Sequence, residues 1–140
     1  MTIREQNLET IAPVLATFTV HQTDGMDDLN DADLGAPVML TAGNECGPIT
    51  SGGQLLGKLI SLTLSDNDHG DRHATVQIGG ICRLKVGATI PSIGNRVVGG
   101  TNNTVRQAPA LGGDDPAGGN IARGTVLAVN GTTDCVILLN

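Results

Sequence analysis

Acidic and imidazole side chains are most densely gathered between residues 66 and 73. Asp66, Asp68, His69, Asp71 and His73 all fall within this short stretch. Carboxylates and imidazoles are ligands for calcium and for first-row transition metals. The spacing departs from an EF-hand calcium loop, because the glycine comes one position early and the distal glutamate is missing. We therefore interpret the stretch as a polar connection between strands. A metal-binding β-domain centred on it, acting as an enzyme or a ligand binder, stays the alternative.

Nucleophilic side chains lack the partners that catalysis needs. None of the serines lies in the Gly-x-Ser-x-Gly turn that exposes a catalytic serine. Cys46 lies in a polar loop, 43–48, and we expect it to be the one exposed thiol, but the sequence identifies no base for it. The glycine pairs at 112–113 and 118–119 are not followed by the Gly-Lys-Ser/Thr of a phosphate-binding loop. The sequence thus predicts a protein that is not an enzyme and has no cofactor.

The net charge is concentrated at the N-terminal end of the chain. The 140 residues carry a net charge of −6. Residues 1–36 contain seven acids and one base, whereas residues 37–140 contain seven of each. We interpret 1–36 as an extended acidic N-terminal arm and 37–140 as a β-domain. The residues expected to contact a partner are the apolar anchor of the arm and the acids that follow it, which are Phe18, Asp24, Asp27, Asp28, Asp31 and Asp33.

Aromatic side chains are almost absent from the chain. Phe18 is the single phenylalanine, and there is no tryptophan or tyrosine. Single-stranded nucleic acids are bound on aromatic faces, and the net charge of −6 disfavours a phosphate backbone, so no nucleic-acid partner is expected. The core must be built from Val, Ile, Leu and Ala, which bury less area per residue than aromatics do. Because burial at a subunit interface would offset this, the composition indicates an oligomer.

The cysteines and the N-terminus point to a reducing compartment. Cys46, Cys82 and Cys135 are widely spaced, and no CxxC pair occurs. Neither a zinc ribbon nor a disulfide framework is therefore expected, and Cys82 and Cys135 are predicted to be small buried hydrophobes. The sequence has no secretory leader and no apolar run long enough to span a bilayer. We expect a soluble protein made in a cytoplasm, without a membrane partner.

Short apolar runs separated by Gly-rich turns predict an all-β fold, a small barrel or sandwich. The clearest element is a hairpin over 122–139 with Asn130-Gly131 in its turn. Its second run, Cys135 to Leu139, has no polar alternation, which predicts a strand covered on both faces. Gly79-Gly80 interrupts a long run over 73–86 and predicts a bulge or a sharp bend.

Four segments within about 75–140 form a pattern of glycine-led strands and turns. They are Gly80-Ile81-Cys82-Arg83-Leu84, Gly94-Asn95-Arg96-Val97, Arg123-Gly124-Thr125-Val126-Leu127-Ala128 and Val136-Ile137-Leu138-Leu139-Asn140. This pattern resembles the capsid decoration, or cement, proteins of tailed phages. Members of that family tend to show a strand opened by glycine, then a hairpin entry of Gly-Asp-x-Val type, a Gly-x-Ala strand and a terminal strand ending in Leu-Asn. In this chain Asn95 stands where the family commonly has an aspartate.

The resemblance implies a small β-barrel or β-tulip-like domain that forms homotrimers on the outside of a virion shell. Its partners would be the major capsid protein and copies of itself, and its function would be to stabilise the assembled bacteriophage head. A receptor-binding or fibre-base module of a virion is a further alternative. In each case the protein would be made in the host cytoplasm.

Overall fold

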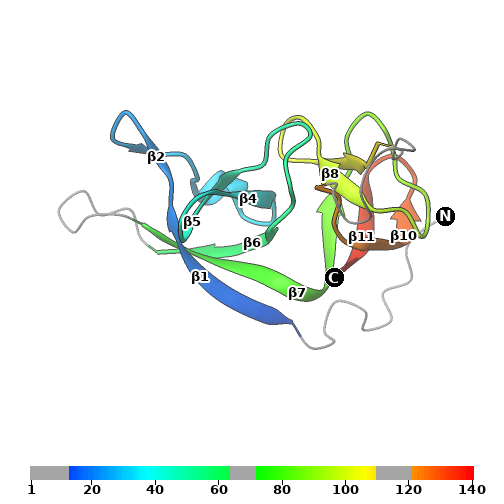
Figure 1. Ribbon diagram of the computed structural model, residues 1–140, viewed down its shortest axis with the longest axis horizontal. Coiled ribbons are helices and arrows are strands. Elements are labelled where there is room, and N and C mark those ends of the chain that lie inside the picture. The colour runs from blue at the N-terminus through cyan, green and yellow to red at the C-terminus, as the bar shows by residue number, and fades with distance from the viewer. Residues whose placement is uncertain (1–12, 64–71, 110–120) are drawn as a thin grey trace.

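The fold is all-β, as the sequence predicts. The computed structural model describes residues 13–63, 72–109 and 121–140 (Figure 1). It contains a closed five-stranded β-barrel and further strands outside the barrel. The expectation of a small β-barrel is confirmed.

Five strands close the barrel. Their order is β1 (Val14–Val20), β5 (Glu45–Pro48), β4 (Pro37–Ala42), β6 (Gly57–Leu62) and β7 (His73–Lys85), and β7 pairs back with β1. β1 and β5 run parallel, and the other pairings in the barrel are antiparallel. Since side chains alternate along a strand, each strand sends one set into the barrel. The interior consists of Val20, Leu29, Val38, Cys46, Leu59, Ala74 and Val76, with Phe18, Leu56, Leu62 and Ile78 packed against them.

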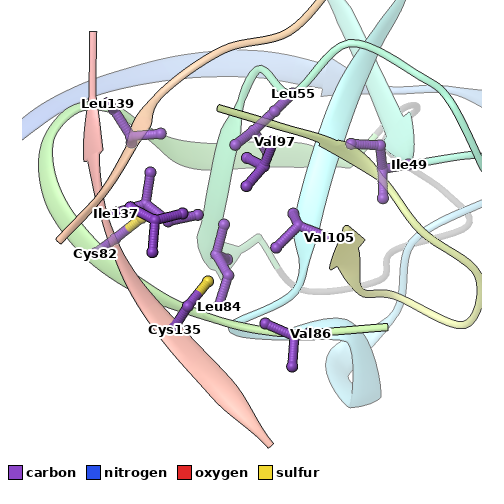
Figure 2. Close-up of a cluster of buried hydrophobic side chains, with 11 residues drawn as sticks. Ile49, Leu55, Cys82, Leu84, Val86, Val97, Val105, Cys135, Ile137 and Leu139 are labelled. Atoms are coloured by element: carbon purple, nitrogen blue, oxygen red, sulfur yellow. The ribbon is translucent and has the colours of Figure 1, made fainter. Parts of the chain in front are cut away.

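A second core lies beside the barrel and uses the far half of β7 (Figure 2). β11 (Asp134–Leu139) pairs with that half, and β10 (Thr125–Asn130) pairs with β11. The short hairpin of β8 (Val97–Gly99) and β9 (Val105–Gln107) contributes buried valines. The buried members of this core are Ile49, Leu55, Cys82, Leu84, Val86, Val97, Val105, Val126, Cys135, Ile137 and Leu139.

The predicted C-terminal hairpin is confirmed as β10 and β11. Gly131, in its turn, has φ +54°, which a glycine adopts without a steric penalty. Val136 and Ile137 are neighbours on β11 and so face opposite sides of the sheet, yet they are 1% and 0% exposed. The strand is covered on both faces, as its lack of alternation predicted.

The predicted bend at Gly79-Gly80 lies where β7 passes from the barrel to the second core. Up to Gly79, β7 pairs with β1, and from Gly80 onward it pairs with β11. Between the pairs Val14↔Gly79 and Leu15↔Gln77 the register skips Ile78, so β7 carries an extra residue there. Gly80 has φ +85°, a conformation that favours glycine.

The interpretation of 1–36 as an arm separate from the β-domain is corrected for residues 13–36. β1 is a barrel strand that pairs with both β5 and β7, and Val20 and Leu29 are buried in the barrel interior. The physical reason is that, without β1, the edges of β5 and β7 would be left unpaired. Three short elements follow β1, namely β2 (Gln22–Thr23), β3 (Met26–Asp27) and the 3-10 helix η2 (Asp31–Asp33). Residues 1–12 lie outside the described chain.

Candidate interaction surface

The acids predicted to contact a partner lie on a hairpin and a short helix between β1 and β4. β2 and β3 form a tight hairpin whose turn residues, Asp24 and Gly25, have φ +54° and +78°. Such positive φ values define the turn that matches the twist of a two-stranded ribbon. Figure 1 shows this hairpin projecting from the barrel, on the side away from β10 and β11.

Asp28 holds the base of this hairpin together. Its Oδ2 lies 2.6 Å from Nδ1 of His21 and accepts a 3.0 Å hydrogen bond from the Thr23 hydroxyl. Its backbone N–H also donates to the carbonyl of His21 at 2.9 Å. The hydrogen bond from His21 lowers the pKa of Asp28, against a smaller opposing effect of burial. Asp28 therefore fixes the position of the hairpin.

Asp31 and Asp33 anchor η2 to distant parts of the chain. Arg72, which is 6% exposed, donates to Oδ1 of Asp31 at 2.9 Å and to the carbonyl of Thr63 at 2.7 Å. One oxygen of Asp33 accepts from the backbone N–H of Asn30 at 2.9 Å, closing a capping box. Its other oxygen accepts from the side-chain amide of Asn103 at 3.0 Å. Both carboxylates thus have structural partners.

The remaining predicted contacts divide between the tip of the hairpin and the barrel. Asp27 accepts a 3.0 Å hydrogen bond from Gln22 across the hairpin. Asp24, exposed at the tip, has no hydrogen bond or ion pair with any residue that the structure describes. Phe18 is partly buried against the barrel interior, so it packs within its own chain. Of the six predicted residues, Asp24 is the one whose polar group faces solvent without a described partner.

Large aliphatic side chains are exposed elsewhere on the surface, and the sequence reading did not single them out. Val14 and Leu15 at the start of β1 are 53% and 52% exposed, and Met26 beside the hairpin turn is 73% exposed. The sequence carried a signal for one of the two residues at 14 and 15, because adjacent apolar residues on a strand face opposite sides and one of them must face outward. The other exposed large hydrophobics among the described residues are Leu34, Leu40, Ile60, Ile93 and Ile121.

The expectation that Cys46 is an exposed thiol is wrong. Cys46 is on β5 and is 0% exposed inside the barrel, because it faces inward opposite Val20 and Leu40. Burial raises its pKa to about 11. Cys82 and Cys135 are 2% and 0% exposed, as predicted, and none of the three cysteines forms a disulfide.

The candidate metal site falls largely outside the described chain. Asp66, Asp68, His69 and Asp71 belong to the undescribed range 64–71, and His73 is exposed at the start of β7. Within residues 13–63, 72–109 and 121–140, no three His, Cys, Asp or Glu side chains gather as a metal would require. Most of the proposed metal-binding loop therefore lies outside the described residues, and the metal-binding alternative stays a prediction from the sequence.

Arg123 is an important residue that the sequence reading missed. It precedes β10 and donates to the backbone carbonyls of Leu55, Leu56 and Ile78. Burial lowers its pKa, since removing water disfavours the charged form. Its signal in the sequence is a single cation directly before the apolar run that forms β10, next to Gly124, which has φ +77°. Its partners lie 45 to 68 positions away, beyond the reach of any local pattern.

Comparisons with known proteins supply no family for this chain. No protein-family model, curated protein or solved structure matches it. Among the helices in the described ranges, none has the length and apolar character needed to cross a membrane.

Proposed function

We propose that this chain is a structural protein of a virion, a capsid decoration protein that binds and stabilises an assembled shell of major capsid protein as a homotrimer. The proposal starts from the resemblance over 75–140 to the decoration proteins of tailed phages. It places the protein on the capsid exterior after synthesis in the host cytoplasm.

The observation that carries the proposal is a set of exposed aliphatic side chains on a barrel whose own core is complete. Val14 and Leu15 lie about half exposed at the start of β1, while Phe18 and Val20 further along the same strand pack into the barrel. Two large apolar side chains exposed side by side in the sequence are suited to contact with another protein surface. Shielding them on a neighbouring subunit would supply the extra burial that the aliphatic composition calls for.

The projecting β2–β3 hairpin is suited to a second contact. At its tip Asp24 offers a carboxylate that has no partner among the described residues, and Met26 beside it offers an exposed apolar side chain. At the base of the hairpin, Nδ1 of His21 lies 2.6 Å from Oδ2 of Asp28, and this contact holds the base together. Because the hairpin is already ordered in the free chain, little conformational entropy would be lost when it docks.

Stabilisation of the shell follows from mass action. A protein that binds the assembled shell and not the free capsid subunits lowers the free energy of the assembled state by its binding free energy. Such a role requires surfaces of defined shape and no reacting groups. Asp27, Asp28, Asp31 and Asp33 then serve to hold the contact surface in place.

The test is sedimentation of the purified chain, alone and with empty shells. We expect a trimer in solution and co-sedimentation with assembled shells but not with capsid subunits. A variant carrying Val14→Ser and Leu15→Ser should lose self-association, and the control Ile93→Ser, on a loop, should keep it. A monomer that does not co-sediment with assembled shells would contradict the proposal.

A further inference from the structure

A pocket lined by cations lies where η2 meets the outer face of β7 and β11. Its volume is about 340 Å³. Three of the chain's eight lysines and arginines line it, namely Lys58, Arg83 and Lys85. Asp134 is the one acid among its lining residues. The lining of the pocket is therefore positively charged, although the net charge of the chain is −6.

The strand pattern of β7 and β11 places these charges on one face. Cys82, Leu84 and Val86 point into the second core, so Arg83 and Lys85, at the alternate positions, point away from it. Asp134 is the cross-strand partner of Lys85 on β11. Lys58 reaches the pocket from β6, with its side chain beside Gly35.

The charges within the pocket do not cancel. Arg83 and Asp134 form an ion pair with 3.5 Å between Nη1 and Oδ2. Neither Lys58 nor Lys85 makes a hydrogen bond or ion pair with any side chain in the part of the chain that the structure describes. The two ammonium groups therefore leave the pocket with an excess positive charge, and its concave shape focuses the resulting potential.

The opposite wall of the pocket is held in place before any ligand arrives. Asn103 lines the pocket and donates to Asp33 of η2 at 3.0 Å, which ties the turn between β8 and β9 to the short helix. The capping box of Asn30 and Asp33 and the Arg72–Asp31 pair fix η2 in turn. A preformed wall lowers the entropic cost of binding.

We propose that this pocket binds the oxyanion of a small ligand, either a phosphate monoester or a dicarboxylate. Two lysines without described partners match a ligand with two negative charges, and lysine binds phosphate and carboxylate as a compact point charge. The lining contains no aromatic residue, so no ring is available to stack a base or a sugar. The ligand is therefore expected to be a compact anion. The proposal does not depend on the role in a shell.

The test is an NMR titration of the ¹⁵N-labelled full chain with inorganic phosphate and, separately, with succinate. Sodium chloride at matched ionic strength serves as the blank. We expect saturable shifts of backbone amides near Gly35, Lys85 and Asn103. Lys58→Gln and Lys85→Gln should each weaken binding at least about tenfold, and Arg106→Gln, which removes a cation from outside the pocket, should change it less than about twofold.

The two titrations separate the sources of the oxyanion. Saturation by phosphate alone identifies a phosphate monoester as the ligand class, and saturation by succinate alone identifies a dicarboxylate. If either variant is poorly folded, Lys58→Arg and Lys85→Arg, which keep the charge, should retain binding within about fivefold. The proposal is overturned if neither anion gives saturable shifts beyond the chloride blank. It is also overturned if the Lys58→Gln and Lys85→Gln double variant binds as the natural chain does.

Discussion

The side chain of Arg123 donates a hydrogen bond to the backbone carbonyl of Ile78, the residue that β7 inserts as an extra member at its bend. An inserted residue leaves backbone groups without ladder partners, and these must be satisfied in another way. Gln77, which is 6% exposed, acts in the same region by donating to the carbonyls of Gly79 and Ile81 at 3.1 Å each. The passage of β7 from barrel to second core therefore depends on two polar side chains.

Arg123→Met is expected to lower the free energy of unfolding by about 3 kcal/mol, because three carbonyls lose a charged donor near the bend. Guanidinium denaturation followed by circular dichroism measures this. The matched control is Arg96→Met, since Arg96 is exposed and donates to a single carbonyl, that of Ala122. It should cost less than about 1 kcal/mol. Equal losses in the two variants would contradict the role of Arg123 at the bend.

Gly57→Ala is expected to destabilise the barrel by about 3 kcal/mol or to prevent folding. A Cβ at this position would lie 1.9 Å from the carbonyl oxygen of Gln77, so β6 would have to move away from β7. Gly43→Ala is the control, because nothing lies within 4 Å of the added carbon. Thermal melts should show Gly43→Ala within about 0.5 kcal/mol of the natural chain. A Gly57→Ala variant of natural stability would show that the two strands do not approach this closely.

His21→Ala is expected to raise the pKa of Asp28 towards the ordinary value of an aspartate, because the hydrogen bond from His21 is the main cause of its lowering. A carboxyl whose pKa is lower in the folded state stabilises the fold above its unfolded pKa. That contribution is lost as the pH falls through the folded pKa. A second variant, Asp28→Asn, removes this carboxyl. The free energy of unfolding of the natural chain should exceed that of Asp28→Asn at neutral pH, and the difference should shrink as the pH falls below about 4. A ¹³C NMR titration of the Asp28 carboxyl measures the pKa directly, and an unchanged value in His21→Ala would refute the assignment.

All three thiols are expected to resist modification in the native protein. They are at most 2% exposed, and burial raises the pKa of Cys46 to about 11 and contributes most to raising that of Cys135 to about 12. At pH 8 the reactive thiolates of Cys46 and Cys135 are therefore scarce as well as inaccessible, and Cys82 is protected by its burial. Ellman's reagent should label the natural chain slowly and label all three cysteines once guanidinium is added. Rapid labelling of any thiol in the folded protein would contradict the burial of the cysteine that reacts.

The sequence was sufficient for the parts of the fold that depend on local patterns. The uninterrupted run at Cys135–Leu139 predicted a strand buried on both faces, and Gly79-Gly80 predicted the bend in β7. Both signals are local, because a strand's burial pattern and a glycine's conformational freedom are properties of neighbouring residues.

Features that depend on distant pairing could not be read from the sequence. β1 closes the barrel by pairing with β5 and β7, which begin more than 20 residues further along the chain, so no local pattern marks it as a core strand. Cys46 lies among polar loop residues in the sequence, but the inward face of β5 buries it. The acids at Asp31 and Asp33 looked available for a partner, and Arg72 and Asn103 bind them within the chain.

The most direct test of the structural role is electron cryo-microscopy of virus particles that contain the protein, compared with particles that lack it. We expect extra density in groups of three, repeated over the whole shell lattice, and lower heat resistance of the particles that lack the protein. Density at only a few sites on the particle would point to a fibre base. Particles of identical appearance and heat resistance in the two preparations would contradict the account.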